Sequence, residues 1–143
     1  MSEIPTKVGF TCGAFDLMHA GHMLMLEDAK SICDKLIVGI QSDPSIDRPF
    51  KNRPVQSFKE RTIMVSGCKY VDEILLYHTE EELLNILKKV NPDVRILGSD
   101  YLNKTFTGKE LPIEIYYHKR EHGWSSHDLR ERVYYIERTE NEG

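Results

Sequence analysis

The chain has 143 residues, 40% of them hydrophobic and 29% charged, and a formal net charge of −4. This composition is typical of one soluble globular domain, and the negative charge argues against a nucleic-acid-binding protein, since such proteins are usually basic. The amino-terminal sequence MSEIPTKVGF has no basic segment followed by a long apolar run, and no apolar stretch approaches the ~20 residues that cross a bilayer. We therefore expect a cytoplasmic protein without membrane insertion, a single domain over residues 1–143.

The first predicted elements alternate between strand and helix. KVGFTC at residues 7–12 predicts a strand, which GAFDLM breaks, and residues 19–33 carry apolar side chains at the spacing of a helix. LIVGI at residues 36–40 is a continuous apolar run, typical of a strand covered on both faces. Residues 41–56 hold three prolines and five charged residues without periodicity, which indicates a long loop of the kind that is usually functional.

The second half of the chain repeats this alternation. Helices are expected at residues 57–68 and 79–90, each opening on a capping-box pattern, Ser57 with Glu60 and Thr79 with Glu82. The remaining predicted elements are strands at residues 70–77, 94–98 and 113–119, an irregular segment at 99–112, and a last helix at 125–138.

This alternation predicts the α/β class, a single Rossmann-like domain with a mainly parallel five-stranded sheet and helices on both faces. In such sheets ligands bind outside the carboxyl ends of the strands. The unusual residues of this sequence follow predicted strands, so we expect one site at that edge. The three cysteines are far apart and form no CxxC pair, so we expect reduced thiols and no protein-bound metal.

Two histidines, His19 and His22, stand three residues apart where the first helix should begin, with Gly21 between them. Backbone N–H groups are unpaired at a helix N-terminus and the dipole is positive there, which favours phosphate. Imidazoles can donate hydrogen bonds to phosphoryl oxygens, and a glycine lets the phosphate approach closely. The alternative is a pair of surface or core-edge histidines without a role.

The last helix offers a second N-terminus at the same edge. Ser125 and Ser126 need no function beyond capping it, but they could also hold phosphate oxygens, with Arg120 upstream as a charge clamp. Lys51 lies in the proline-bounded loop, which can fold over a ligand, and we expect it to contact phosphate.

Two further residues are placed against local preference or at a strand end. Arg61 falls in the first turn of a predicted helix, where the dipole disfavours a cation, so an anionic ligand would explain it. Asp100 follows a glycine after a strand, where it is either a turn residue or an acceptor for a sugar hydroxyl or an amine. Two positive helix N-termini and several cations around one crevice suit a polyphosphate whose α-phosphorus is attacked, with pyrophosphate leaving.

The motifs also resemble a known family. GAFDLMHAGH at residues 13–22 resembles the GxFDxxHxGH signature of the nucleotidyltransferase superfamily, in its cytidylyltransferase branch, and is most similar to the glycerol-3-phosphate cytidylyltransferases. The resemblance continues over nearly the whole chain, in Arg61, in YVDE at residues 70–73, in GSDY at 98–101, and in REHGWSS at 120–126, which is similar to RTxGISTS.

The resemblance implies a reaction in which CTP and a phosphorylated alcohol such as glycerol 3-phosphate give a CDP-alcohol and pyrophosphate, with Mg²⁺, in a protein that is often a homodimer. It implies four residues in catalysis: His19, His22, Lys51 and Arg120. It implies nucleotide binding by Gly13, Ala14, Phe15, Gly21, Asp100, Tyr101, Arg120, Ser125 and Ser126, and acceptor binding by Arg61, Lys69 and Asp72.

Three positions depart from the family pattern. Glu121 replaces a threonine and Trp124 an isoleucine in the last motif, and Lys69 replaces an arginine, losing its bidentate fork. The acceptor can therefore differ from glycerol 3-phosphate. The alternatives are an adenylyltransferase acting on FMN or a sugar phosphate, and a nucleotide-binding module without catalysis; a redox flavoprotein is disfavoured because no dinucleotide fingerprint is present.

Overall fold

A computed structural model describes residues 6–141, so the first five residues of the amino-terminal sequence discussed above lie outside it. Within this range the strands form one five-stranded sheet of order β3-β2-β1-β4-β5, and every neighbouring pair is parallel. The strands are β1 (Val8–Gly13), β2 (Lys35–Gln41), β3 (Glu73–Tyr77), β4 (Val94–Gly98) and β5 (Glu114–His118). The predicted parallel α/β fold is confirmed.

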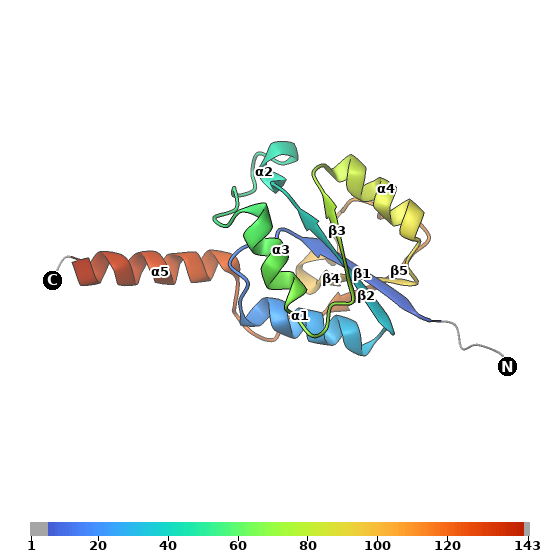
Figure 1. The fold of residues 1–143 in the computed structure, drawn as a ribbon, viewed down its shortest axis with the longest axis horizontal. Coiled ribbons are helices and arrows are strands. Elements are labelled where there is room, and N and C mark those ends of the chain that lie inside the picture. Colours follow the sequence, from blue (N-terminus) through green and yellow to red (C-terminus); the bar gives the residue numbers. More distant parts are fainter. Residues whose placement is uncertain (1–5, 142–143) are drawn as a thin grey trace.

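The helices cover both faces of this sheet, as Figure 1 shows. They are α1 (Ala20–Ser31), α2 (Pro44–Asp47), α3 (Phe58–Ser66), α4 (Glu80–Val90) and α5 (Ser126–Asn141), with a 3-10 turn η1 (Ser99–Tyr101) after β4. Side chains alternate along β2, so Val38 packs with Leu26 of α1 and Val65 of α3, while Ile37 packs with Leu87 of α4 on the other face. Burial of each such side chain contributes about 1.5–3 kcal/mol to stability.

The predicted helix starts are largely confirmed by their capping hydrogen bonds. Ser57 and Glu60 form the expected capping box at α3. Thr79 caps α4, but the Glu82 carboxylate accepts the backbone N–H of His78 rather than that of Thr79 (2.6 Å), so the predicted second box is wrong.

Two element boundaries also differ from the prediction. The segment 41–56 is not wholly a loop, since it contains the short helix α2, which Asp43 caps through the backbone N–H of Ser45. Strand β3 begins at Glu73 rather than at residue 70. The preceding residues turn instead, because Asp72 uses its carboxylate to accept the backbone N–H of Leu36.

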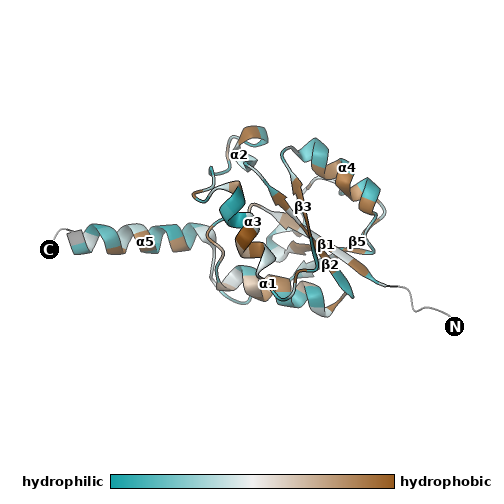
Figure 2. Cartoon of the chain, in the orientation of Figure 1, coloured by the Kyte–Doolittle hydropathy of each residue, from teal (hydrophilic) through white to brown (hydrophobic). Residues whose placement is uncertain are grey.

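Helix α5 differs from the other helices in its packing. It extends away from the sheet (Figure 1), and Figure 2 colours most of its residues as hydrophilic. Its first turn contacts the domain, while every residue from 131 to 140 is exposed. Thus only the N-terminus of α5 contributes to the site described next. In the described part of the chain, no helix combines the length and the apolarity that crossing a membrane requires.

Candidate functional site

Two cavities open at the carboxyl edge of the sheet. The small cavity, about 270 Å³, is lined by residues from the loop after β1, from α1, from the segment 44–54 and from the start of α5. The large cavity, about 720 Å³, lies over the ends of β1 and β4 and under the segment 98–107. Lys51 lines both cavities, so its ammonium can serve a group held at their boundary.

The two histidines form the cap of α1. His19 is the N-cap residue, and its Nδ1 accepts the backbone N–H of Gly21 (3.0 Å). His22 Nδ1 accepts the backbone N–H of His19 (3.1 Å), and the ring centroids lie 4.0 Å apart. Because both Nδ1 atoms accept, the proton of each neutral ring is on Nε2. The helix start therefore presents two Nε2–H donors.

Both imidazoles are held neutral at physiological pH. Burial, with the positive charge of His19 and Arg120, lowers the pKa of His22 to about 4. Burial also lowers the pKa of His19, helped by His122 and Arg120. Neutral Nε2–H groups donate to phosphoryl oxygens without depending on pH near 7, as a preorganised oxyanion site requires.

Gly21 is needed for this arrangement. A Cβ at Gly21 would lie 2.8 Å from Cε1 of His19 and 3.0 Å from Cε1 of His122. His122 is a third imidazole that the sequence analysis did not single out. Its Nδ1 accepts the backbone N–H of Trp124 (3.2 Å), its ring stacks on that indole, and its buried Nε2 has no partner among the described residues.

Asp16 fixes the loop between β1 and α1. Its carboxylate accepts the backbone N–H groups of Val55 and Gln56 and pairs with Arg130 of α5 (2.7 Å). Burial alone would raise the pKa of Asp16, but these three donors outweigh it and lower the pKa below its ordinary value. They hold a loop in which Phe15 and Leu17 have positive φ (54° and 49°), a costly conformation for such residues.

The start of α5 lies against the same loop. The Ser126 hydroxyl donates to the carbonyl of Asp16 (3.2 Å) and lines the small cavity together with His22. Ser125 caps the helix through the N–H of Asp128 (3.1 Å). Arg120 donates to the carbonyl of Trp124 (2.9 Å), near enough to the histidines to lower their pKa. The two helix N-termini thus meet at one cavity.

The other expected nucleotide-binding residues divide between the cavities. Ala14 and Phe15 line the small cavity, while Gly13, Asp100 and Tyr101 line the large one. The large cavity also contains charged residues that the sequence analysis did not assign to a site, chiefly Arg48 paired with Glu80 (2.9 Å) and Arg95 of β4.

Arg61 lies beneath the site and does not open into either cavity. It is 2% exposed, and its guanidinium donates to the carbonyl oxygens of Ala14, Gln41, Ser42 and Gln56. These acceptors belong to the loops that follow β1 and β2 and precede α3. These carbonyl acceptors, rather than an anionic ligand, explain why Arg61 stands in the first turn of α3, where the helix dipole disfavours a cation. Through them Arg61 connects the loops that form the wall of the site.

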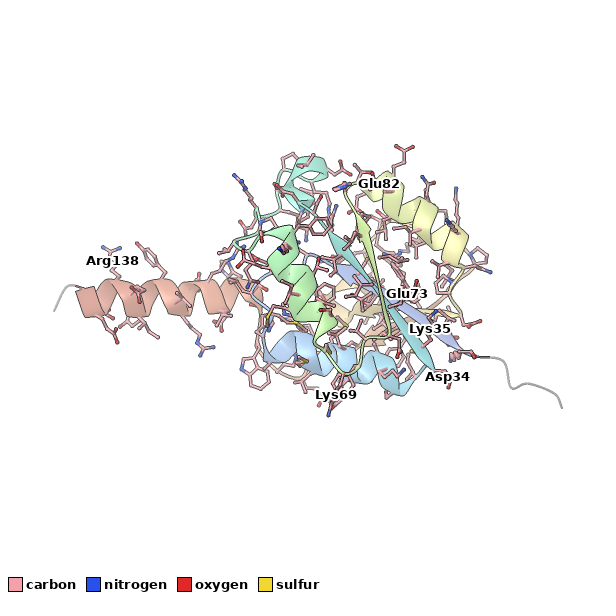
Figure 3. The ribbon with its side chains drawn as sticks, viewed as in Figure 1. Asp34, Lys35, Lys69, Glu73, Glu82 and Arg138 are labelled. Carbon is pink, nitrogen blue, oxygen red and sulfur yellow. The ribbon has the colours of Figure 1, made fainter. Side chains whose placement is uncertain are left out.

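Lys69 and Asp72 lie away from the histidines. Asp72 pairs with Lys30 (2.5 Å) and accepts the N–H of Leu36, at the amino end of β2, opposite the site. Lys69 lines a separate groove beside α1 and points outward at the bottom of Figure 3. The structure therefore does not bring these two expected acceptor-binding residues to the site.

Comparison with known proteins identifies relatives of the whole fold. A family model described as cytidylyltransferase-like matches residues 10–132. The bifunctional protein HldE of Helicobacter pylori (strain HPAG1) is 36% identical over 137 residues, 95% of this chain and 29% of that protein. HldE of Caulobacter sp. (strain K31) is 41% identical over 108 residues, 75% of this chain and 22% of that protein. The chain thus spans less than a third of the length of these relatives.

Solved structures share the fold at low identity. The lipopolysaccharide core biosynthesis protein of Thermoplasma volcanium GSS1 has a TM-score of 0.59 at 21% identity, covering 92% of this chain and 89% of that one. The pantoate-beta-alanine ligase of Francisella tularensis, complexed with beta-gamma ATP and beta-alanine, has a TM-score of 0.58 at 17% identity, covering 87% and 65%.

Proposed function

Because the chain belongs to the cytidylyltransferase-like family of the nucleotidyltransferase superfamily, we propose that it transfers a nucleoside monophosphate from a nucleoside triphosphate to a phosphorylated acceptor and releases pyrophosphate. The observation that carries this proposal is the meeting of two helix N-termini at one small cavity, which His22 and Ser126 line, with the His19 ring 4.0 Å from that of His22. Such a site suits a triphosphate.

The chemistry is a single displacement at phosphorus. An oxygen of the acceptor phosphate attacks the α-phosphorus, the bond from that phosphorus to the α–β bridging oxygen breaks, and the electron pair leaves with pyrophosphate. His19 and His22 donate hydrogen bonds to the phosphoryl oxygens as negative charge develops on them. Lys51, at the boundary of the two cavities, supplies a positive charge where the acceptor phosphate and the triphosphate meet.

The N-terminus of α5 binds the rest of the triphosphate. Ser126 and His127 of its first turn line the small cavity, and Arg120 adds a permanent charge close to the imidazoles. Trp124 and Glu121 replace the family's usual residues on this segment, and we propose that they adjust the recognition of the base.

We favour adenylyl transfer to a sugar phosphate over CMP transfer to glycerol 3-phosphate, which was our first interpretation of the sequence. The curated relatives reported above are named HldE rather than glycerol-3-phosphate cytidylyltransferase. One structural neighbour is named for lipopolysaccharide core biosynthesis and another was solved with an ATP compound.

Mg²⁺ and a homodimer remain proposals. In the described residues no group of three or more His, Cys, Asp or Glu side chains could hold a metal ion, which fits an ion carried in by triphosphate oxygens and water rather than a resident one. When bound, such an ion neutralises charge on the β- and γ-phosphates. Titration with Mg²⁺ and the sedimentation of the purified chain test these two points.

The test of the proposed function is pyrophosphate release in a matrix of nucleotides and acceptors. ATP and CTP are each combined with hexose phosphates, heptose phosphates, glycerol 3-phosphate and FMN. We expect turnover with ATP and a sugar phosphate. Turnover with CTP and glycerol 3-phosphate alone would restore our first interpretation, while a nucleotide-induced rise in Tm without pyrophosphate from any acceptor would favour a non-catalytic binding module.

A further inference from the structure

Arg95 is a buried cation without a counter-ion in the described part of the chain. It is 3% exposed and lies in β4, in the otherwise apolar sequence VRILG. Its guanidinium donates to the carbonyl of Thr107 and approaches Cys12 Sγ (3.9 Å), and its buried Nε has no partner. No carboxylate of the described residues forms an ion pair with it at 4 Å or less. An isolated buried charge of this kind is costly unless an anion compensates it.

The surroundings keep this guanidinium open to the large cavity. Arg95 lines that cavity, and its Cζ lies 5.2 Å from the ring centroid of Phe106. Gly108 has φ +86°, and a Cβ there would lie 3.2 Å from Nη1 of Arg95. The segment that follows β4 thus folds tightly over the arginine from one side and leaves the cavity side free.

The large cavity has an excess of positive charge. Arg48, Lys51, Arg95 and Lys104 line it against the carboxylates Glu80 and Asp100, and Glu80 is already paired with Arg48. A cavity with this balance favours an anionic ligand. Since Lys51 also borders the small cavity, one anionic group belongs at that boundary, and Arg95 has the position for another.

The position of Arg95 separates it from the reacting phosphate. Arg95 precedes Gly98, the end of β4, by three residues, which is about 10 Å along a strand. Its Nη2 lies near Cys12 of the neighbouring strand β1, one residue before that strand ends. The arginine side chain lies on the α4 face of the sheet, close to Gly108, which in turn lies close to Leu87. The histidines lie on the other face, beyond the carboxyl end of β1.

We propose that the part of the large cavity around Arg95 receives the acceptor, beside the expected nucleotide-binding residues Gly13, Asp100 and Tyr101. Arg95 is then its anion-binding residue, so that the acceptor is a sugar or polyol phosphate with a second anionic group remote from the phosphate that is nucleotidylated. This inference rests on the proposed nucleotidyl transfer. The second group is a phosphate or a carboxylate, which a guanidinium binds in the same bidentate geometry.

The experiment compares acceptors that differ only at the remote end. Pyrophosphate release is measured with glucose 1-phosphate, glucose 1,6-bisphosphate and glucuronic acid 1-phosphate. We expect kcat/KM to be about 10²-fold higher for at least one acceptor with a second anionic group than for glucose 1-phosphate, a typical effect of a charged hydrogen-bonded pair; preference for the bisphosphate or the uronate identifies the group. Equal kcat/KM for all three overturns the proposal.

The variant Arg95→Gln assigns the preference to this residue. We expect it to remove the preference while the KM for the nucleotide stays unchanged. The matched control is Lys109→Gln, because Lys109 also lies over the Phe106 ring (5.8 Å) but is exposed and outside the cavity lining. A preference retained in Arg95→Gln, or lost equally in Lys109→Gln, overturns the proposal.

Binding without turnover separates this inference from the proposed function. The affinity for glucuronic acid 1-phosphate and for inorganic phosphate is measured by calorimetry, and we expect Arg95→Gln to weaken one of them at least tenfold. If no acceptor gives pyrophosphate but this loss is seen, the proposed function fails and the anion site stands. Should Arg95→Gln not fold, Arg95→Lys replaces it, and unchanged affinities in a less stable Arg95→Lys indicate a structural role and overturn the proposal.

Discussion

The two cavities differ in the groups that they offer to an anion. Besides Lys51, which borders both cavities, the small cavity has the imidazole of His22, which is neutral at pH 7, and the start of α5. The large cavity contains the permanent charge of Arg95, buried and without a carboxylate partner in the described structure. Neutral oriented donors suit charge that develops during a reaction, while a fixed buried cation suits a charge that the ligand brings with it.

The largest expected effect concerns Arg61, which joins the loops beneath the site through its carbonyl acceptors. Replacing Arg61 with Met leaves buried carbonyl groups of three loops without donors, and we expect the free energy of unfolding to fall by about 3–5 kcal/mol. Chemical denaturation measures this loss. The control is Lys59→Met on the same helix, where the side chain is exposed. A stable Arg61→Met variant that loses only its affinity for the acceptor would show that Arg61 binds the acceptor rather than supporting the loops.

The next effect tests the neutral donors of the small cavity. His22→Ala removes an Nε2–H group, and we expect kcat to fall by about 10²–10³-fold, as for loss of one oxyanion-type donor. His22→Gln can place an amide N–H near the same position, so it should retain more activity than His22→Ala. Circular dichroism checks that both variants fold. Activity near that of the wild type in His22→Ala would remove the imidazole from the mechanism.

A smaller effect is expected from crowding the same donors. Gly21→Ala inserts a methyl group within about 3 Å of both His19 and His122, so the rings must move, and overpacking of this kind costs roughly 1–3 kcal/mol. We expect a lower Tm and a reduced kcat with little change in the acceptor preference that Arg95 determines. The matched control is Gly67→Ala, because no atom lies closer than 3.6 Å to a Cβ there. A loss of acceptor preference would show that the two cavities are not independent.

The last expected effect, which is absent at neutral pH, is the pH dependence of stability. The unfolded His22 binds a proton near its ordinary pKa of 6.5, while the folded residue does so only near pH 4. Stability is therefore fully present above pH 6.5 and falls as the pH is lowered towards about 4, since the unfolded state then binds more protons. Denaturation of the wild type and of His22→Gln over this range measures the difference, and NMR titration of His22 gives its pKa directly.

The sequence predicted the fold and the position of two histidines at the start of a helix because both depend on local patterns. Alternating apolar runs and helical periodicity define a parallel sheet, and Ser57, Thr79 and Ser125 each begin a helix through a hydrogen bond within three residues. The failures involve contacts between distant segments. The four carbonyl acceptors of Arg61 and the partners of Asp72 depend on how loops meet, which periodicity does not describe.

Two site residues were missed although the sequence contained a signal for each. Arg95 interrupts a short apolar strand predicted to be buried, and a charge in such a run indicates a partner or a ligand. His122 stands between Arg120 and the serines of the last motif. His122 lies close to Gly21 because of the turn before α5, which no residue spacing predicts. Only its place in the motif at residues 120–126 could have indicated a role for His122.

Asp16 has a consequence for how the small cavity meets its ligand. One carboxylate fastens the loop after β1, the backbone at residues 55 and 56, and Arg130 of α5, and these three segments carry the lining of the cavity. The folded protein thereby holds the three segments in one arrangement. A ligand of the small cavity would not have to order them, which lowers the entropy cost of its binding.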